Sequence, residues 1–166
     1  MKLVISDLMP EQLRQVIHVN DDTVIISNDN RIKHCIGCFG CWIKTPGTCV
    51  IKDPYQHLGE LFSKCTDMII ISKCVYGGYS PFVKNVLDRG LSYLHPDFEI
   101  RHNEMHHKMR YKNKFDLSIC FYGDSISDAE MITAKEMAKA NFVNYAPKKH
   151  NLYLVNSLEE IGGLFL

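Results

Sequence analysis

Apolar and polar residues follow two different periods along this chain, and the alternation between these periods predicts strands and helices in turn. Short uninterrupted runs of β-branched and other apolar residues are typical of strands that are buried on both faces. Segments in which apolar residues recur every three or four positions are typical of helices with one buried face. The predicted strands cover residues 3–5, 23–26, 68–71, 115–121 and 151–155. The predicted helices cover residues 10–18, 54–65, 81–95 and 128–143, and a last one follows Ser157.

Local signals support several of these boundaries. Asp53 and Ser80 are each followed by proline, which is typical of an N-cap and the first turn of a helix. Ser157 has a glutamate three positions later, the spacing of a capping box. Residues 97–113 hold three histidines and several basic residues without any periodicity, so we expect a loop or excursion there. Loops of this length are often functional.

The order of the elements predicts one α/β domain over residues 1–166. Strands that alternate with helices are typical of a flavodoxin-like, doubly wound sheet of five parallel strands in the order 2-1-3-4-5, with helices on both faces making three layers. A chain of 166 residues is large enough to bury one hydrophobic core. Ligands of such sheets bind beyond the carboxyl ends of the strands, at the switch point between the first and third strands. The predicted site therefore lies on the loops that follow the first, third and fourth strands.

Charge and composition narrow the kinds of partner. The chain has 19 basic and 19 acidic residues, so no overall field attracts it to nucleic acid or to an anionic membrane. The first residues lack the basic flank, the length and the cleavage site of a signal peptide, and no later segment approaches a membrane span. We therefore expect a cytoplasmic protein. Seven cysteines in such a chain favour reduced, metal-binding or catalytic thiols over a disulfide scaffold.

Four of these cysteines lie within fifteen residues. They are Cys35, Cys38, Cys41 and Cys49, on a segment with too many glycines for a helix. Thiolates on such a loop suit zinc, an iron-sulfur cluster or a dithiol that cycles with a disulfide. The alternative is that the thiols only pack a turn, since free cysteine behaves as a small hydrophobic residue. The sequence leaves these readings open, and predicts that the other three cysteines belong to the core.

The three loops of the predicted site differ in what they offer a ligand. Residues 6–10 lack glycine and closely spaced hydroxyls, and Asp7 has the wrong charge beside an anion, which argues against tight binding of a mononucleotide phosphate. Residues 72–81 contain two glycines, which permit close approach of the backbone, and two tyrosines, which suit stacking. Residues 121–127 again combine aromatic residues with a glycine and polar groups. The last two loops suit a flat, hydrogen-bonding ring system.

Three stretches of the sequence resemble one known family. They are Cys35-Ile-Gly-Cys-x-x-Cys-Trp with Pro-Gly-x-Cys-x-x-Lys-Asp53, then Val75-Tyr-Gly-Gly-Tyr-Ser-Pro-x-x-Lys84, then Leu87-Asp-Arg89. Together they resemble the NAD(P)H-dependent FMN reductase family, which is flavodoxin-like, and its iron-sulfur flavoprotein branch. The resemblance implies an FMN isoalloxazine ring against Val75, Tyr76, Gly77, Gly78 and Ser80, with Tyr122 and Gly123 nearby. In the iron-sulfur branch it implies a 4Fe-4S cluster on Cys35, Cys38, Cys41 and Cys49.

The leading hypothesis from the sequence is an FMN-dependent oxidoreductase that passes electrons from reduced nicotinamide through flavin to a small acceptor or a protein partner. No catalytic side chain is named, because in flavin enzymes the cofactor performs the hydride chemistry and the protein supplies position and electrostatics. The resemblance also implies a homo-oligomer. Two alternatives stay open: an electron carrier with a 4Fe-4S cluster on the cysteine loop, and a binding module that has lost FMN, which the Asp7 loop permits.

Overall fold

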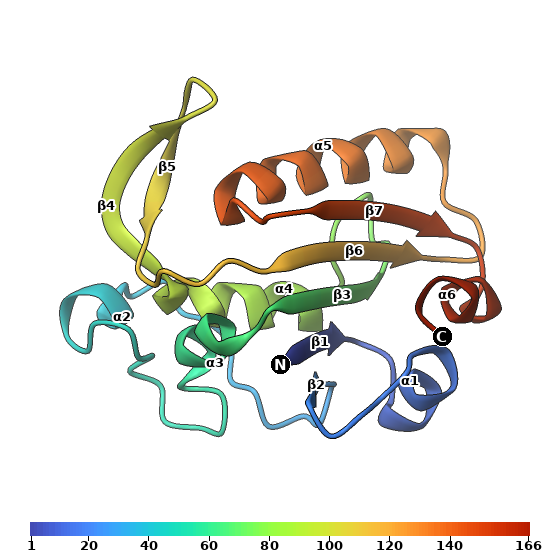
Figure 1. Cartoon of the computed structure of the whole chain (residues 1–166), viewed down its shortest axis with the longest axis horizontal. Coiled ribbons are helices and arrows are strands. Elements are labelled where there is room, and N and C mark those ends of the chain that lie inside the picture. Colours follow the sequence, from blue (N-terminus) through green and yellow to red (C-terminus); the bar gives the residue numbers. More distant parts are fainter.

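Five parallel strands form the central sheet of the computed structural model, which describes residues 1–166 (Figure 1). The strand order is β2-β1-β3-β6-β7, with every pair parallel. Two further strands, β4 and β5, form a separate antiparallel hairpin between α4 and β6. Without that hairpin the order is 2-1-3-4-5, so the predicted flavodoxin-like α/β fold is confirmed. The sheet strands are β1 (Lys2–Ser6), β2 (Thr23–Ile26), β3 (Asp67–Lys73), β6 (Asp116–Tyr122) and β7 (His150–Val155).

Helices cover both faces of the sheet because successive strand residues point to opposite sides. Leu3 and Ile5 of β1 belong to the larger hydrophobic cluster, whereas Val4, between them, belongs to the smaller one. The larger cluster receives side chains from α3, α4 and α5, and the smaller one from α1 and α6. The helices are α1 (Pro10–Val16), α2 (Gly40–Ile43), α3 (Leu58–Lys64), α4 (Pro81–Arg89), α5 (Asp128–Tyr145) and α6 (Leu158–Phe165), with a 3-10 turn η1 (Gly90–Tyr93) after α4.

Two of the three predicted helix starts are found. The hydroxyl of Ser80 accepts a hydrogen bond from the backbone N–H of Val83 and caps α4. The hydroxyl of Ser157 accepts one from the N–H of Glu160. The Glu160 carboxylate, however, accepts from the N–H of Asn156 at 3.4 Å, so only half of the predicted capping box forms.

The prediction for Asp53 was wrong. Turns occupy the residues after it, and α3 begins only at Leu58, with His57 as its N-cap. The Asp53 carboxylate instead binds the guanidinium of Arg89 on α4. An aspartate before a proline is a local signal for a helix N-cap. Here the aspartate binds a charged partner 36 positions away instead of capping a helix.

The excursion expected at residues 97–113 is present as a hairpin and not as an irregular loop, and the prediction of a helix that continues to residue 95 was wrong. The 3-10 turn η1 follows α4, and then β4 (Leu94–Arg101) pairs with β5 (Glu104–Met109). The two residues between the strands, His102 and Asn103, both have positive φ, as a two-residue hairpin turn requires. A short alternation of apolar and polar residues at 98–101 was the signal for the first strand.

The hairpin stands away from the main sheet and reaches past the end of α5 (Figure 1). Arg101 fixes it there, because its guanidinium donates hydrogen bonds to the carbonyls of Val143 and Asn144 at 2.8 and 2.7 Å. These carbonyls lie in the last turn of α5, where backbone oxygens lack helical partners and a cation is favourable. None of the helices combines the length and the apolar character that a crossing of the bilayer requires.

Candidate functional site

The loops after β3 and β6 lie side by side, as the sheet order requires. Lys73 and Tyr122 are register partners at the ends of the two strands, and the N–H of Cys74 donates to the carbonyl of Tyr122 at 2.8 Å. The sequence-predicted cofactor residues are thereby brought to one edge of the sheet. They are Val75, Tyr76, Gly77, Gly78 and Ser80 from the first loop, and Tyr122 and Gly123 from the second. Their role in binding a cofactor stays a prediction.

Tyr76 and Gly77 form a two-residue turn that Val75 and Gly78 close. Val75 and Gly78 exchange two backbone hydrogen bonds of 3.0 and 2.8 Å, and Tyr76 and Gly77 between them have φ values of 52° and 79°. A Cβ on Gly77 would lie 2.5 Å from the Cβ of Thr133 on α5, so only glycine lets the turn pack against this helix. The side chain of Tyr76 projects from the turn and is 88% exposed. The turn therefore presents one aromatic ring on a rigid support.

The other predicted residues already have internal partners. The N–H of Ser80 donates to the hydroxyl of Ser72 at 2.8 Å, and the Ser80 hydroxyl caps α4. The N–H of Gly123 donates to the carbonyl of Val155 at 3.2 Å. The backbone and hydroxyl groups of Ser80 and Gly123 therefore stabilise the loops at the edge of the sheet. The exposed ring of Tyr76 and the cavity side of Gly78 are accessible to a ligand.

The first residue after β1, Asp7, places a carboxylate at the switch point. The Asp7 side chain accepts hydrogen bonds from the N–H of Lys73 at 3.1 Å and from the hydroxyl of Tyr122 at 3.1 Å. Burial raises the pKa of Tyr122, and the Asp7 carboxylate raises it further because it stabilises the protonated phenol. Helix α1 has only seven residues and starts with Pro10, which has no N–H to offer. The residues after β1 therefore do not fit a phosphate, since the N–H of Lys73 and the hydroxyl of Tyr122 already bind the Asp7 carboxylate.

A cavity of about 700 Å³ lies beside the tyrosine-glycine turn, between α4 and α5. Its size is that of a site for a small organic ligand. The wall includes Gly78 of the turn and the adjacent Tyr79, Leu87 from α4, Leu91 from η1, Met137 from α5, and Cys35 from the cysteine loop. The sequence did not indicate this cavity, because leucines at helical spacing are equally typical of a closed core.

Tyr79 contributes to the wall of this cavity, but its hydroxyl is buried in the protein. The hydroxyl has no hydrogen-bond partner, and burial raises the pKa of Tyr79. A buried hydroxyl without a partner costs about 1–3 kcal/mol. Because this oxygen has almost no accessible surface, a ligand in the cavity does not reach it. The glycine turn and the cavity together fit a flat, mainly apolar ring.

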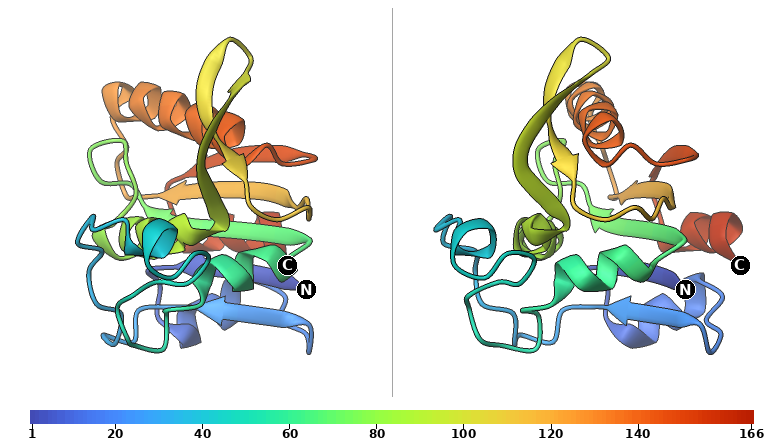
Figure 2. Two further views of the ribbon diagram at one scale, coloured as in Figure 1. Left: turned by 90° about the vertical axis from the view of Figure 1, so that its left-hand side faces the viewer. Right: turned by 60° about the vertical axis from the view of Figure 1, so that its left-hand side comes forward.

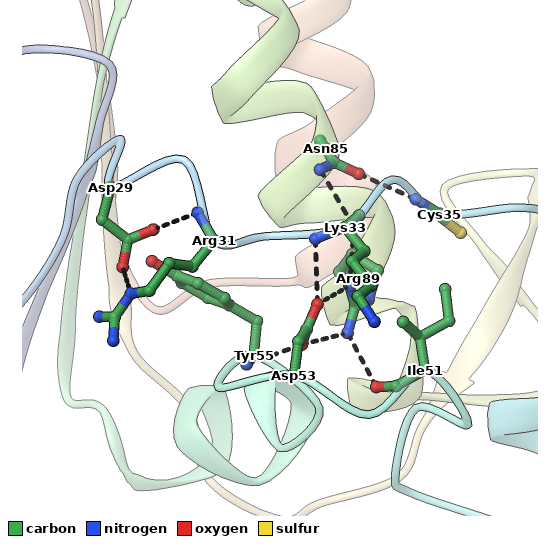
Figure 3. Close-up of polar contacts among 9 residues, drawn as sticks. All are labelled: Asp29, Arg31, Lys33, Cys35, Ile51, Asp53, Tyr55, Asn85 and Arg89. Atoms are coloured by element: carbon green, nitrogen blue, oxygen red, sulfur yellow. Dashed lines mark hydrogen bonds and ion pairs between the residues drawn. The ribbon is translucent and has the colours of Figure 1, made fainter.

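A buried ion pair fastens the cysteine loop to α4 (Figure 3). The guanidinium of Arg89 donates two hydrogen bonds to the Asp53 carboxylate, at 2.7 and 2.8 Å, and the exposed fractions of the two side chains are 0% and 4%. The same guanidinium donates to the carbonyls of Lys33 and Ile51. Residues 33 and 51–53 are the two ends of the cysteine loop, so one arginine holds both.

Asn85, one helical turn before Arg89, adds to this attachment. Its side-chain oxygen accepts a hydrogen bond from the N–H of Cys35 at 3.0 Å, and its amide group donates to the carbonyl of Lys33 (Figure 3). The Arg89 hydrogen bonds hold the pKa of Asp53 at about 2, against burial, which by itself would raise it. Two side chains of α4 therefore hold both ends of the loop.

The four cysteines of the loop do not form a ligand set in this structure. No group of three or more His, Cys, Asp or Glu side chains is arranged to hold a metal ion. Cys38 is exposed, whereas Cys41 is buried in the short helix α2, and burial raises the pKa of its thiol. The arrangement therefore does not fit a four-thiolate cluster, and the predicted absence of helix in this loop was wrong for residues 40–43.

Two of the three remaining cysteines lie in the core, as predicted. Cys65 and Cys120 are buried, and burial raises the pKa of both thiols to about 12. Cys74 is only partly buried, at the end of β3. Thiols with such high pKa values stay protonated and inert at neutral pH.

Comparisons with known proteins bear on the fold. No family model and no curated protein matches the sequence. Among solved structures, the FMN-dependent NADH-azoreductase of Bacillus anthracis in complex with FMN superposes with a TM-score of 0.52 at 10% identity, over 98% of this chain and 96% of that one. The Trp repressor binding protein of Bacillus subtilis gives a TM-score of 0.49 at 15% identity, over 97% and 90% of the two chains. The similarity to the azoreductase supports the flavodoxin-like fold of this chain.

Proposed function

We propose that this chain is an FMN-dependent oxidoreductase that takes electrons from reduced nicotinamide and passes them to a small acceptor. The observation that carries the proposal is the rigid tyrosine-glycine turn at the switch-point edge, directly beside a cavity of a size that suits a small organic ligand. The fold shared with an FMN-dependent NADH-azoreductase supports the same class of reaction. When bound, the flavin supplies the hydride chemistry.

In this proposal, the residues of the protein bind and orient the flavin ring. The ring of Tyr76 stacks on the face of the isoalloxazine, and the lack of a side chain at Gly78 lets the backbone approach the ring closely. Leu87 of α4, Leu91 of η1 and Met137 of α5 keep water from the apolar part of the ring.

Asp7 sets a limit on how the flavin is held. Its carboxylate already takes the N–H of Lys73 and the hydroxyl of Tyr122, so the 5′-phosphate of FMN finds a negative charge where a phosphate seat would lie. We therefore expect the isoalloxazine ring to provide nearly all of the affinity. Riboflavin, which lacks the phosphate, is expected to bind about as tightly as FMN.

Titration of the purified chain with FMN and with riboflavin, followed by quenching of flavin fluorescence, tests the proposal. Similar dissociation constants are expected for the two flavins. In an Asp7→Ser variant the two donors become free for the phosphate, so FMN is expected to gain about tenfold over riboflavin, or about 1.4 kcal/mol. The matched control is Asp124→Ser, which removes an exposed carboxylate after β6 and leaves the Asp7 contacts intact. It is expected to leave the ratio unchanged.

Two outcomes contradict the proposal. A chain that binds neither flavin is not a flavin enzyme and favours the binding-module alternative. A chain that binds flavin but whose flavin-loaded form oxidises neither NADH nor NADPH, measured by nicotinamide absorbance, is not a nicotinamide-dependent oxidoreductase. A strong preference of the unmodified chain for FMN over riboflavin would contradict only the role given to Asp7.

A further inference from the structure

A second cavity, of about 560 Å³, lies at the amino ends of β6 and β7, whereas the tyrosine-glycine turn follows the carboxyl end of β3. Its wall comes from the tip of the β4–β5 hairpin, the last two turns of α5 and the residues at the start of β6 and β7. Figure 2 shows the hairpin beside the carboxyl end of α5, which lines this cavity. Helix α5 also lines the first cavity, but with other residues, and the two cavities share no wall residue. The second cavity is therefore a separate site.

Basic side chains make up most of the polar part of this wall. Lys114 and Lys139 both line the cavity, and neither ammonium group takes part in an ion pair. His102 and His150 add ring N–H groups, which can donate hydrogen bonds. The chain as a whole has a formal charge of zero, so this wall concentrates positive charge locally. A concave surface of one sign attracts ligands of the opposite sign, here an anion.

Two features of the wall would repel an anion, and both already have partners. The carboxylate of Glu104, the one acidic group of the wall, lies 2.9 Å from Nε2 of His106. The last carbonyls of α5 carry partial negative charge, but the guanidinium of Arg101 binds those of Val143 and Asn144. The guanidinium is thereby occupied, and the two lysines remain as the free cations of the wall.

The rest of the wall is apolar and includes a stacked pair of rings. The ring centroids of Phe142 and His150 lie 4.3 Å apart, with an angle of 29° between the ring planes. Val143, Ala146 and Pro147 complete the apolar part. The cavity has the size of a site for a small organic ligand and is far larger than one phosphate ion requires, since a water molecule takes about 30 Å³ of the liquid. The wall therefore suits a ligand that joins an anionic group to a flat ring.

We propose that this cavity binds a nucleoside phosphate. The phosphate oxygens accept hydrogen bonds from the ammonium groups of Lys114 and Lys139, and the base packs against the rings of Phe142 and His150. Sheets of this kind bind their usual ligands at the carboxyl ends of the strands, so the fold alone does not predict a site at this opposite edge. Binding here does not require a flavin, because the two cavities have no wall residue in common.

Isothermal titration calorimetry of the full chain with ADP, in the absence of divalent cations, tests this inference. ADP is expected to bind more tightly than adenosine or inorganic pyrophosphate, because only ADP engages both the lysines and the ring pair. The double variant Lys114→Gln, Lys139→Gln is expected to weaken ADP binding by at least about tenfold. The matched control is Lys44→Gln, Lys52→Gln, which changes the formal charge equally at two exposed lysines outside the cavity. This control is expected to bind ADP as the wild-type chain does.

Two further measurements keep the test decisive in case the double variant fails to fold. Glu104→Gln removes the one carboxylate of the wall, so the affinity for ADP is expected to rise about threefold. In the unmodified chain, amide hydrogen exchange over residues 139–150 is expected to slow when ADP is added, whereas exchange over α6 is expected to stay constant.

Several results overturn the inference. A wild-type chain that binds no ADP at concentrations up to about 1 mM overturns it, and so does a folded double variant that binds ADP as tightly as the control. Pyrophosphate that binds as tightly as ADP overturns it as well, because the ring pair then contributes nothing. Displacement of ADP by riboflavin would place the nucleotide in the first cavity and would also overturn it.

Discussion

The replacement of Asp53 by asparagine tests how the cysteine loop is held. The Asp53 carboxylate and the Arg89 guanidinium are both almost fully buried and share two hydrogen bonds of 2.7 and 2.8 Å. The Asp53→Asn variant keeps the shape of the side chain but leaves a buried guanidinium without a counter-charge. Breaking a buried pair from one side costs about 3–5 kcal/mol. We expect a loss of this size in the free energy of unfolding, measured by urea denaturation with far-UV circular dichroism.

The pH dependence of this loss has a definite sign. The pKa of Asp53 is about 2 in the folded chain, against an ordinary value of 3.8. Because the folded-state pKa is lowered, the stabilisation is fully present above the unfolded pKa and is lost as the pH falls through the folded pKa. The difference corresponds to about 2 kcal/mol, most of which is expected to disappear between pH 5 and pH 2 in the wild-type chain. The Asp53→Asn variant lacks this contribution, so the gap between the two stability curves is expected to narrow by about 2 kcal/mol at low pH.

The control for this experiment is a more exposed carboxylate on α4, the helix that carries Arg89. Asp88 pairs with Lys84 at 2.6 Å, but the two side chains are 43% and 66% exposed. Asp88→Asn is therefore expected to cost less than about 1 kcal/mol. A loss for Asp53→Asn no larger than the loss for Asp88→Asn would refute the reasoning, as would two curves that stay parallel from pH 5 to pH 2. The double variant Asp53→Asn, Arg89→Met is expected to lose less than the sum of the two single changes.

Two further predictions concern the turn and the thiols. Gly77→Ala is expected to lower the free energy of unfolding by about 2 kcal/mol or more, because the residue has φ of 79° and the new Cβ would clash with α5. Gly163→Ala in α6 is expected to be neutral or stabilising, because its Cβ would meet nothing within 4 Å. Urea denaturation of both variants checks this prediction. Alkylation of the native chain with iodoacetamide at neutral pH, read by mass spectrometry, is expected to modify the exposed Cys38 and to spare Cys65 and Cys120, whose buried thiols have pKa values of about 12. Labelling of Cys65 or Cys120 as fast as Cys38 would contradict the placement of these thiols in the core.

The features of the fold that depend on local pattern were predictable from the sequence. The run at 68–71 forms the middle of β3, and the run at 115–121 corresponds to β6, because an apolar run of this length has few other ways to be buried. The hairpin was missed because its alternation is short and interrupted by histidines, which are weak strand formers. The ion pair of Asp53 with Arg89 was missed because the two residues are 36 positions apart, and no local signal reports a distant partner.

The candidate site was predictable only in part, for a similar reason. The loops that meet at the switch point follow from strand order alone, and the structure places them together. Asp7 was recognised as a poor neighbour for a phosphate, but its hydrogen bonds to Lys73 and Tyr122 depend on three strands lying side by side. The cavity depends on how far α4 and α5 stand apart. That separation is a property of packing, which the spacing of leucines does not encode.

Helix α4 links these features mechanically. Its side chains Asn85 and Arg89 hold the two ends of the cysteine loop, while Leu87 lines the cavity. Cys35, whose N–H is bound by Asn85, lies in the wall of the same cavity. Loss of the Asn85 contacts would therefore move a wall of the proposed flavin site without touching the turn that supports Tyr76. In an Asn85→Ala variant, the loss in the free energy of flavin binding is expected to exceed the loss in the free energy of unfolding. Equal flavin affinity of the variant and the wild-type chain would show that the loop and the cavity are independent.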